Sequence, residues 1–326
     1  MRHIFEFECN GPVWQVAFSP NGRYLACASG DGYLRVFSVD SWDIVFSHKS
    51  ENEMIRVAFS PNGRYLACLD VYAFLWVFSS ACWGVEFEFE HEKYVWSLSF
   101  SPDSRFLATG TMGNRVRVFN LHEKTVVLEY RHGNEILCLD FDPQGKYLVS
   151  GGMDRHVKIY STMGWLKVFD SKFRGPVEAL GFCRNGKLLV ITDTKGFIYV
   201  LQSGTWARIL ELRLCGGIYY IGPCSNNLLP IACKGNILKI IDISRWRSIY
   251  ELDLEGTILN AKFAPNPRYL AICDDEGTLL IIDTTINWDI IHREKLWGPI
   301  YSLAFSHSGL LAFGGEDQHL RIFKVW

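Results

Sequence analysis

Three features that would assign a function at once are missing from this 326-residue sequence. No apolar stretch approaches the roughly 20 residues of a membrane-spanning helix. The opening residues, MRHIFEFE, place acids inside their apolar run, unlike a secretory signal. Neither charge is in excess, because 33 Lys and Arg stand against 35 Asp and Glu, and this balance does not indicate nucleic acid or a membrane surface as a partner. We expect a cytoplasmic protein (or a nuclear one, in a eukaryote) that is not secreted and has no transmembrane segment.

The ten cysteines also lack the patterns of a metal site or a disulfide framework. There is no C-x-x-C pair and no Cys/His cluster with ligand spacing. Cys27 and Cys68 occupy one position of an internal repeat, and Cys273 lies one residue beyond that position in its own copy, as small buried residues do. We therefore predict reduced, structural cysteines, and neither a metal nor a cofactor.

The main feature that is present is this internal repeat. Phe18 opens the segment FSPNGRYLACASGDGYLRVFS, and related segments open at Phe59, Phe100 and Phe141, each 41 residues further on. Weaker copies follow, and two columns of apolar residues have eight members each. The first column is Leu25, Leu66, Leu107, Leu148, Leu189, Leu229, Leu270 and Leu311. The count predicts eight repeats, of which the sixth is degenerate.

Each repeat has the pattern of four short strands. In the first copy we expect strands over 13–18, 24–28, 33–38 and 42–47, with Ser19-Pro20-Asn21-Gly22 as a tight turn. Four strands in about 40 residues are typical of a propeller blade. The fold class predicted is all-β, a single eight-bladed β-propeller of four-stranded antiparallel blades. Seven blades remain the alternative if the sixth repeat is expelled.

The two ends of the chain complement each other. The sequence stops at Trp326, just after a third strand, so the last blade lacks its fourth strand. Stepping back 41 residues from the fourth-strand residue Phe46 gives Phe5. A strand at about 2–9 should therefore complete the last blade and close the ring, since an open ring would leave a sheet edge unpaired. We expect residues 1–326 to form one domain.

The repeat resembles the WD-repeat family across essentially the whole chain. The resemblance rests on the spacing and on the Phe-Ser-Pro-Asn-Gly-Arg-Tyr-Leu-Ala core, while the name-giving Trp-Asp pair is replaced, for example by Phe37-Ser38. It implies a buried hydrogen-bond chain in each well-kept blade. The fourth repeat keeps most of it, and the other blades are expected to pack mainly through apolar contacts. The implied members are His132, Ser150, Asp154 and Tyr160.

No catalytic constellation accompanies the repeats. His132, Ser150 and Asp154 superficially resemble a hydrolase trio, but no nucleophile elbow or oxyanion loop goes with them. We predict that the protein is not an enzyme and has no small-molecule substrate.

The leading hypothesis is a protein-interaction scaffold or adaptor, a subunit of a multiprotein complex that binds proteins or peptides. The resemblance implies that side chains at the start of each innermost strand lie on the top face of the propeller. Aromatic and Arg side chains there would suit an interface. The candidates are Trp14, Ile55, Arg56, Trp96, Glu178 and Tyr301.

Two other functions stay open. The first is a phosphoinositide or nucleic-acid reader that uses the basic residues of the turns, although net charge does not indicate it. These residues are Arg23, Arg64, Arg105, Lys146 and Arg268. The second, less favoured, is a propeller enzyme that uses a central channel.

Overall fold

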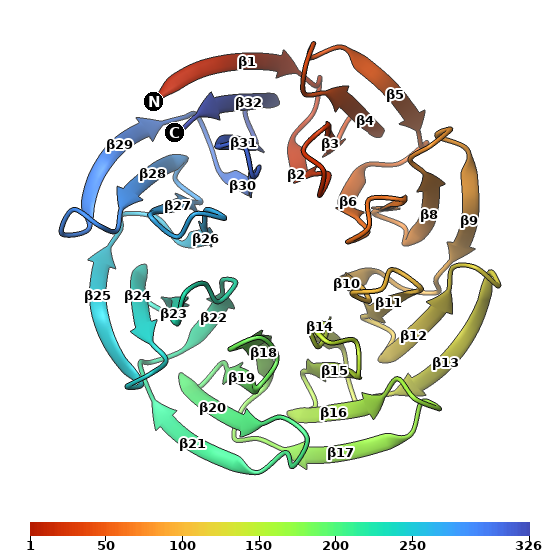
Figure 1. Cartoon of the computed structure of the whole chain (residues 1–326), viewed down its shortest axis with the longest axis vertical. Coiled ribbons are helices and arrows are strands. Elements are labelled where there is room, and N and C mark those ends of the chain that lie inside the picture. The colour runs from red at the N-terminus through yellow and green to blue at the C-terminus, as the bar shows by residue number, and fades with distance from the viewer. The chain divides into compact units, whose positions relative to one another are not determined.

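The computed structural model describes residues 1–326 and contains eight four-stranded antiparallel sheets. They are the blades of an eight-bladed β-propeller (Figure 1), so the predicted fold class is confirmed and the seven-bladed alternative is wrong. The sixth blade keeps all four strands, although its first strand has only four residues. The structure contains no helix with the length and apolarity that a membrane crossing requires.

The first four blades follow chain order. Their strands are β2 (Val13–Phe18), β3 (Tyr24–Ser29), β4 (Tyr33–Ser38) and β5 (Ile44–Lys49); β6 (Met54–Phe59), β7 (Tyr65–Asp70), β8 (Phe74–Ser79) and β9 (Val85–Glu90); β10 (Val95–Phe100), β11 (Phe106–Thr111), β12 (Arg115–Asn120) and β13 (Thr125–Arg131); β14 (Ile136–Phe141), β15 (Tyr147–Gly152), β16 (His156–Ser161) and β17 (Lys167–Lys172).

The last four blades continue the order, and only the eighth departs from it by taking β1. Their strands are β18 (Val177–Cys183), β19 (Leu188–Asp193), β20 (Phe197–Gln202) and β21 (Arg208–Arg213); β22 (Ile218–Ile221), β23 (Leu228–Cys233), β24 (Ile237–Asp242) and β25 (Arg247–Asp253); β26 (Ile258–Phe263), β27 (Tyr269–Asp274), β28 (Thr278–Asp283) and β29 (Asp289–Lys295); β30 (Ile300–Phe305), β31 (Leu310–Gly315), β32 (His319–Lys324) and β1 (Arg2–Glu8).

The contacts of the chain divide it into two compact units. The first unit is Met1–Glu90, Gly235–Ile240 and Ser248–Trp326, and the second is His91–Lys234 and Ile241–Arg247. Within each unit the first strands of consecutive blades pack side by side. These neighbours are β26 with β30, β30 with β2 and β2 with β6 in the first unit, and β10 with β14, β14 with β18 and β18 with β22 in the second.

The N-terminal strand completes the last blade, as predicted. In Figure 1 β1 lies beside β32, and the antiparallel register pairs Phe7 with Leu320 and Glu8 with His319. A bulge separates His3 from Phe5. The same irregularity recurs between the third and fourth strands of other blades, for example at Val36 and Phe37. Thus β1 has the geometry of a fourth strand as well as its position.

Stacked aromatic rings join several neighbouring blades of the first unit. Phe46 of β5 stacks on Trp83 of the following blade, with ring centroids 5.2 Å apart. Phe5 of β1 stacks on Trp42 in the same way, also at 5.2 Å. Trp42 and Trp83 both have a positive φ, so the tryptophan ends a turn before the fourth strand begins. This is why that strand starts at Ile44 and not at the predicted residue 42.

Middle strands are buried on both faces, which accounts for their lack of polar alternation. All six residues of β27 and all but the first residue of β3 are buried. Cys27, Cys68 and Cys273 have no exposed surface, so their prediction as small core residues is confirmed.

The pairing of β1 makes a specific prediction about stability. Phe5→Ala should lower the free energy of unfolding by about 2 kcal/mol, because it removes the stack on Trp42 and the edge contact with Phe37. Arg2→Ala, in the same strand at an exposed position, should change it by less than about 0.5 kcal/mol. Chemical denaturation measures both, and equal values for the two variants would contradict this role of β1.

Candidate functional site

The top face is defined here as the surface at which the first strand of each blade begins. Antiparallel order also brings to this end the loop between the second and third strands and the loop that leads from the fourth strand into the next blade. Each predicted partner-binding residue lies near the start of a first strand: Trp14 on β2, Ile55 and Arg56 on β6, Trp96 on β10, Glu178 on β18 and Tyr301 on β30.

Two of these residues form an aromatic pair across consecutive blades. The rings of Trp14 and Tyr301 stack with centroids 4.6 Å apart. The indole N–H of Trp14 donates to Glu53 Oε2 (3.0 Å), and the hydroxyl of Tyr301 donates to Glu316 Oε2 (2.8 Å). Burial and the nearby Glu316 raise the pKa of Tyr301 to about 12, so the phenol keeps its proton. The pair is therefore fixed in one geometry before any partner arrives.

The other predicted residues differ in how accessible they are. Ile55 is buried, and Arg56 beside it is half-buried. In the second unit, Trp96 is 37% exposed and packs edge-on against Tyr94. Glu178 is half-buried, and burial raises the pKa of its carboxyl. Trp96 thus offers the most open apolar surface among the predicted residues, whereas Ile55 contributes mainly to the core.

Further apolar side chains of the top face were missed from the sequence. Tyr72, in the loop between β7 and β8, is 73% exposed, and Trp297, in the loop before β30, is 77% exposed. In the second unit, Met112 and Met153 are exposed in the corresponding second loops of their blades. The signal was available, because Tyr72 stands where the first repeat has the polar turn residue Asp31.

The fourth blade contains a buried hydrogen-bond chain. His132 Nδ1 lies 3.0 Å from Asp154 Oδ2, and its Nε2 lies 2.8 Å from Ser150 Oγ. The backbone N–H of Gly133 also donates to Asp154, and these bonds hold the pKa of Asp154 well below its usual range. The chain continues from Ser150 to the hydroxyl of Tyr130 (2.8 Å). Tyr160, which the family resemblance implied as the last member, stacks on Tyr130 at 4.0 Å.

In each of three other blades, the ion pairs of one arginine connect strands and loops of that blade, contrary to the expectation of mainly apolar packing. Arg35 pairs with Asp31, and Arg321 pairs with Asp317 and Glu6. Arg117 forms ion pairs with Glu92 (2.6 Å) and Glu129 (2.7 Å). Its Nη1 atom also lies 3.2 Å from Nδ1 of His91. The arginine and its partners fall on different strands or loops of the blade, so the ion pairs connect them. The sequence did not predict these ion pairs, because the family's buried chain is marked by a His–Asp pattern and not by arginine.

These features agree with comparisons to known proteins. The WD40 family model "WD domain, G-beta repeat" matches residues 1–38, 85–120 and 124–161. These three segments of the chain are therefore repeats of the WD40 type. A curated relative, mouse "WD repeat-containing protein 20", is 50% identical over 40 residues, which are 12% of this chain and 7% of that protein.

Solved structures agree with the fold over the full length. The crystal structure of Saccharomyces cerevisiae Sqt1 has a TM-score of 0.88 at 14% identity and covers 99% of each chain. The crystal structure of the computationally designed Ika8 protein has a TM-score of 0.87 at 14% identity and covers both chains completely.

The fourth blade of the propeller is not arranged for hydrolysis. Ser150 has no exposed surface, and both nitrogens of His132 are already engaged. A substrate carbonyl could not reach the hydroxyl without opening the blade. No three His, Cys, Asp or Glu side chains are grouped to hold a metal ion.

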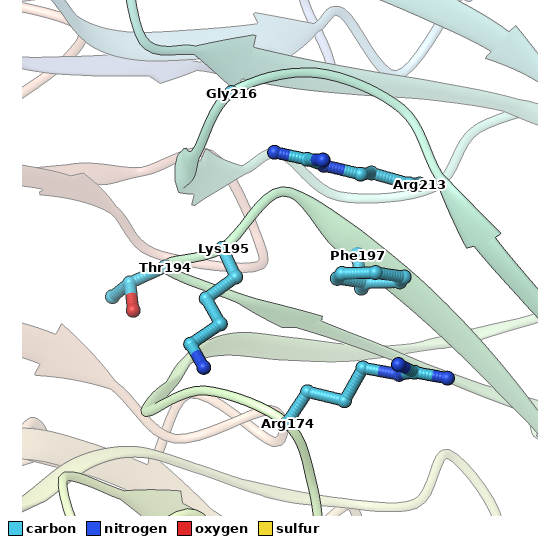
Figure 2. Close-up of a pocket in the computed structure, with 6 residues that line it drawn as sticks. All are labelled: Arg174, Thr194, Lys195, Phe197, Arg213 and Gly216. Carbon is cyan, nitrogen blue, oxygen red and sulfur yellow. The ribbon is translucent and has the colours of Figure 1, made fainter.

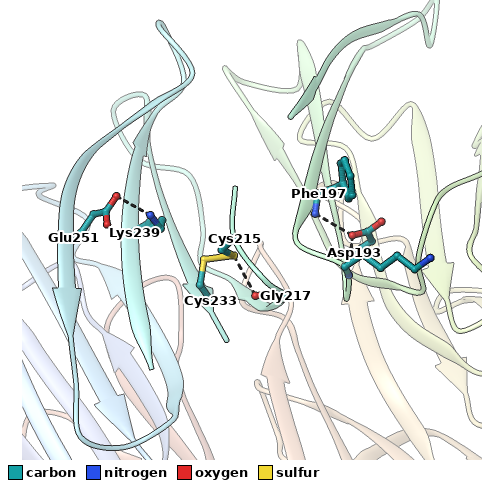
Figure 3. Close-up of a disulfide and its surroundings, with 8 residues drawn as sticks. Asp193, Phe197, Cys215, Gly217, Cys233, Lys239 and Glu251 are labelled. Atoms are coloured by element: carbon teal, nitrogen blue, oxygen red, sulfur yellow. Dashed lines mark hydrogen bonds and ion pairs between the residues drawn. A yellow bond between two sulfur atoms is a disulfide. The ribbon is translucent and has the colours of Figure 1, made fainter. Parts of the chain in front are cut away.

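One cysteine pair corrects the prediction of reduced cysteines. Cys215 and Cys233 form a disulfide, with Cα atoms 6.3 Å apart (Figure 3). It joins the loop before β22 to the end of β23 in the degenerate sixth blade. No sequence pattern marks this pair, because Cys215 and Cys233 are 18 residues apart and lie outside the repeated columns.

A matched pair of variants tests which tyrosine ends the hydrogen-bond chain. Tyr130→Phe should lower the free energy of unfolding by about 1–2 kcal/mol, because it leaves the buried Ser150–His132 chain one partner short. Tyr160→Phe retains the ring stack and should cost less than about 0.5 kcal/mol. Urea denaturation measures both changes in the free energy of unfolding. A larger decrease for Tyr160→Phe would show that the hydrogen-bond chain ends at Tyr160, as the family resemblance implies.

The buried carboxyl group of Asp140 connects two neighbouring blades and makes stability depend on pH. Asp140 on β14 accepts a hydrogen bond from Ser99 on β10 (2.9 Å), and burial raises its pKa to about 6. A raised pKa means that the folded state holds this proton more tightly than the unfolded state does. The associated stability is present below about pH 4 and is lost as pH rises through about 6.

The Asp140→Asn variant has no carboxyl group to ionise at this position, so it should not lose stability as pH rises through about 6. Relative to wild type, the variant should gain about 2 kcal/mol of stability between pH 4 and pH 7.5. Asp40→Asn, at an exposed turn, should follow the wild-type curve. Denaturant melts across this pH range measure the difference, and a variant curve parallel to wild type would show that Asp140 does not titrate there.

Proposed function

We propose that residues 1–326 act as one WD40 propeller domain that binds other proteins or peptides and holds them in a multiprotein complex. The observation that carries the proposal is the Trp14–Tyr301 pair, fixed by two carboxylates on the top face of the first unit. Aromatic residues with fixed geometry lose little conformational entropy when they bind, which is why they dominate interface energetics.

The exposed residues of the same face support this proposal. Tyr72 and Trp297 are large aromatics with about three quarters of their surface in water. Trp96, Met112 and Met153 offer exposed apolar surface at the same end of blades in the second unit. Single exposed apolar residues are common, but Tyr72, Met112 and Met153 recur in the loop between the second and third strands, which is typical of an interaction surface. The partner class proposed is therefore protein, and the compartment is the cytoplasm or nucleus.

No catalytic step is part of the proposal. The buried Ser150 and the fully engaged His132 favour a structural role for the most enzyme-like group in the chain. The top face would act through binding alone.

The test is an affinity purification of the tagged full chain from native lysate, with quantitative mass spectrometry. It compares wild type with a Trp14→Ala/Trp96→Ala/Tyr301→Ala variant and with Tyr72→Ala/Trp297→Ala. The second variant changes only exposed side chains, so it should leave folding intact. We expect stoichiometric partners in wild type to fall about tenfold or more in both variants.

A control variant removes equally exposed apolar residues from the other end of a blade. Met163 and Leu166 lie in the turn between β16 and β17 and are 88% and 68% exposed. Met163→Ala/Leu166→Ala should retain the partners. Loss of partners from the control but not from the top-face variants would refute the assigned surface, and the absence of any stoichiometric protein in wild type would refute the scaffold function.

A further inference from the structure

The fifth blade carries a basic pocket that the scaffold function does not use. Its volume is about 550 Å³, and it opens at the top face of the second unit. Figure 2 shows its lining residues. They come from the loop before β18 (Arg174), the turn between β19 and β20 with the start of β20 (Thr194, Lys195 and Phe197), and the end of β21 with the following loop (Arg213 and Gly216).

A phenyl ring holds two of the cations in place. In Figure 2 Phe197 lies between the side chains of Arg174 and Arg213. The guanidinium carbons lie 4.9 Å and 5.9 Å from the ring centroid. Cation–π contacts of this kind lower the entropic cost of ordering a long side chain when it binds a ligand.

Nearby carboxylates do not cancel the positive charge. Glu211 accepts from Arg174 (2.6 Å) and from Arg208 (2.7 Å), so it is shared between two arginines. Asp193 is fully buried, and its oxygens accept the backbone N–H groups of Gly175, Lys195 and Phe197 and the hydroxyl of Tyr199.

Lys195 and Arg213 make no ion pair and are exposed. Two cations thus remain without a carboxylate partner at the mouth of the pocket. Arg174 adds a third positive group, although Glu211 offsets part of its charge. An anion that enters the pocket would meet these charges without having to break an existing ion pair of Lys195 or Arg213.

The loop that contributes Gly216 to the pocket is held by close backbone contacts. Leu214 donates its N–H to the carbonyl of Gly196 (2.8 Å). Gly196 has φ +83°, and a Cβ there would lie 2.0 Å from the carbonyl oxygen of Cys215, so only glycine allows this approach. The Cys215–Cys233 disulfide and the bond from Lys234 N–H to the carbonyl of Gly217 (2.8 Å) anchor the same loop to β23 (Figure 3).

The anchored loop leaves its glycine open to the pocket. Nothing lies within 4 Å of the place where a Cβ of Gly216 would stand. Backbone and cations therefore surround a space that a ligand can fill with little rearrangement of the chain.

We propose that this pocket binds the phosphate group of a small phosphorylated molecule, either free in solution or as a lipid headgroup. A phosphate dianion presents three acceptor oxygens, which match the Lys195 ammonium, the Arg213 and Arg174 guanidiniums and the Thr194 hydroxyl. The cavity volume falls in the range of small-molecule sites, which is about 300–1,000 Å³. The site is distinct from the Trp14–Tyr301 pair, which lies in the first unit.

Isothermal titration calorimetry of the full chain with inorganic pyrophosphate tests the free-ligand source. Sedimentation with phosphatidylcholine vesicles that contain a lipid with a phosphomonoester headgroup tests the lipid source. We expect binding in at least one arm, weakened about tenfold or more by Lys195→Gln and by Arg213→Gln, and weakened by added salt. Both side chains are exposed, so thermal melts should show the variants to be folded.

Lys146→Gln is the matched control, because Lys146 is an exposed lysine in a turn at the opposite end of the fourth blade. It should bind as wild type does. Binding only to pyrophosphate would identify a soluble ligand, and binding only to the phosphorylated vesicles would identify a headgroup, and both results would support the phosphate site. Binding in neither arm, or an equal loss in Lys146→Gln, would overturn it.

Discussion

The fold depends on one repeated contact, in which an aromatic residue of a fourth strand stacks on the tryptophan that precedes the fourth strand of the next blade. Phe46 on Trp83 and Tyr250 on Trp288 show the contact within the first unit. A blade buries both faces of its middle strands, so it is stable only when its neighbours cover them. Phe5 on Trp42 supplies the same contact from the N-terminal strand. The first residues of the chain thus belong to its last blade, and loss of β1 would expose an edge of β32 and the ring of Trp42.

The departures from the repeat are where we place function. Tyr72 and Trp297 occupy loop positions that are polar in better-kept repeats, and both are highly exposed. The short β22 and the Cys215–Cys233 disulfide belong to the most degenerate repeat, and the loop they anchor forms a wall of the basic pocket. Residues that recur in every blade serve the blade-to-blade contacts, whereas residues that break the pattern are released from that role.

The sequence predicted the fold well because its evidence is repeated. Eight leucines in register locate every second strand, and a shift of one residue would turn the whole strand to its other face. Trp42 shows the limit, since its positive φ ends the turn two residues later than strand propensity suggests. The sixth blade could be counted only from apolar columns such as Leu229, because its first strand lost the marker phenylalanine.

The site could be predicted only in part, because it depends on contacts between distant residues. Trp14 and Tyr301 were both expected at the start of innermost strands on the top face, and the repeat pattern did not predict that their rings stack. Tyr130 in place of Tyr160, the Arg117 ion pairs and the Cys215–Cys233 bond each depend on side-chain directions that no repeat column encodes. The basic pocket combines side chains from three loops, and the repeat pattern does not encode which of these charged side chains come together.

Amide hydrogen exchange of the intact chain is the most direct test of the central claim that β1 is a blade strand. The amides of Arg2–Glu8 should exchange as slowly as those of Ile44–Lys49 and should open together with β30 to β32. Exchange of Arg2–Glu8 at the rate of an unstructured peptide, with β32 still protected, would contradict it.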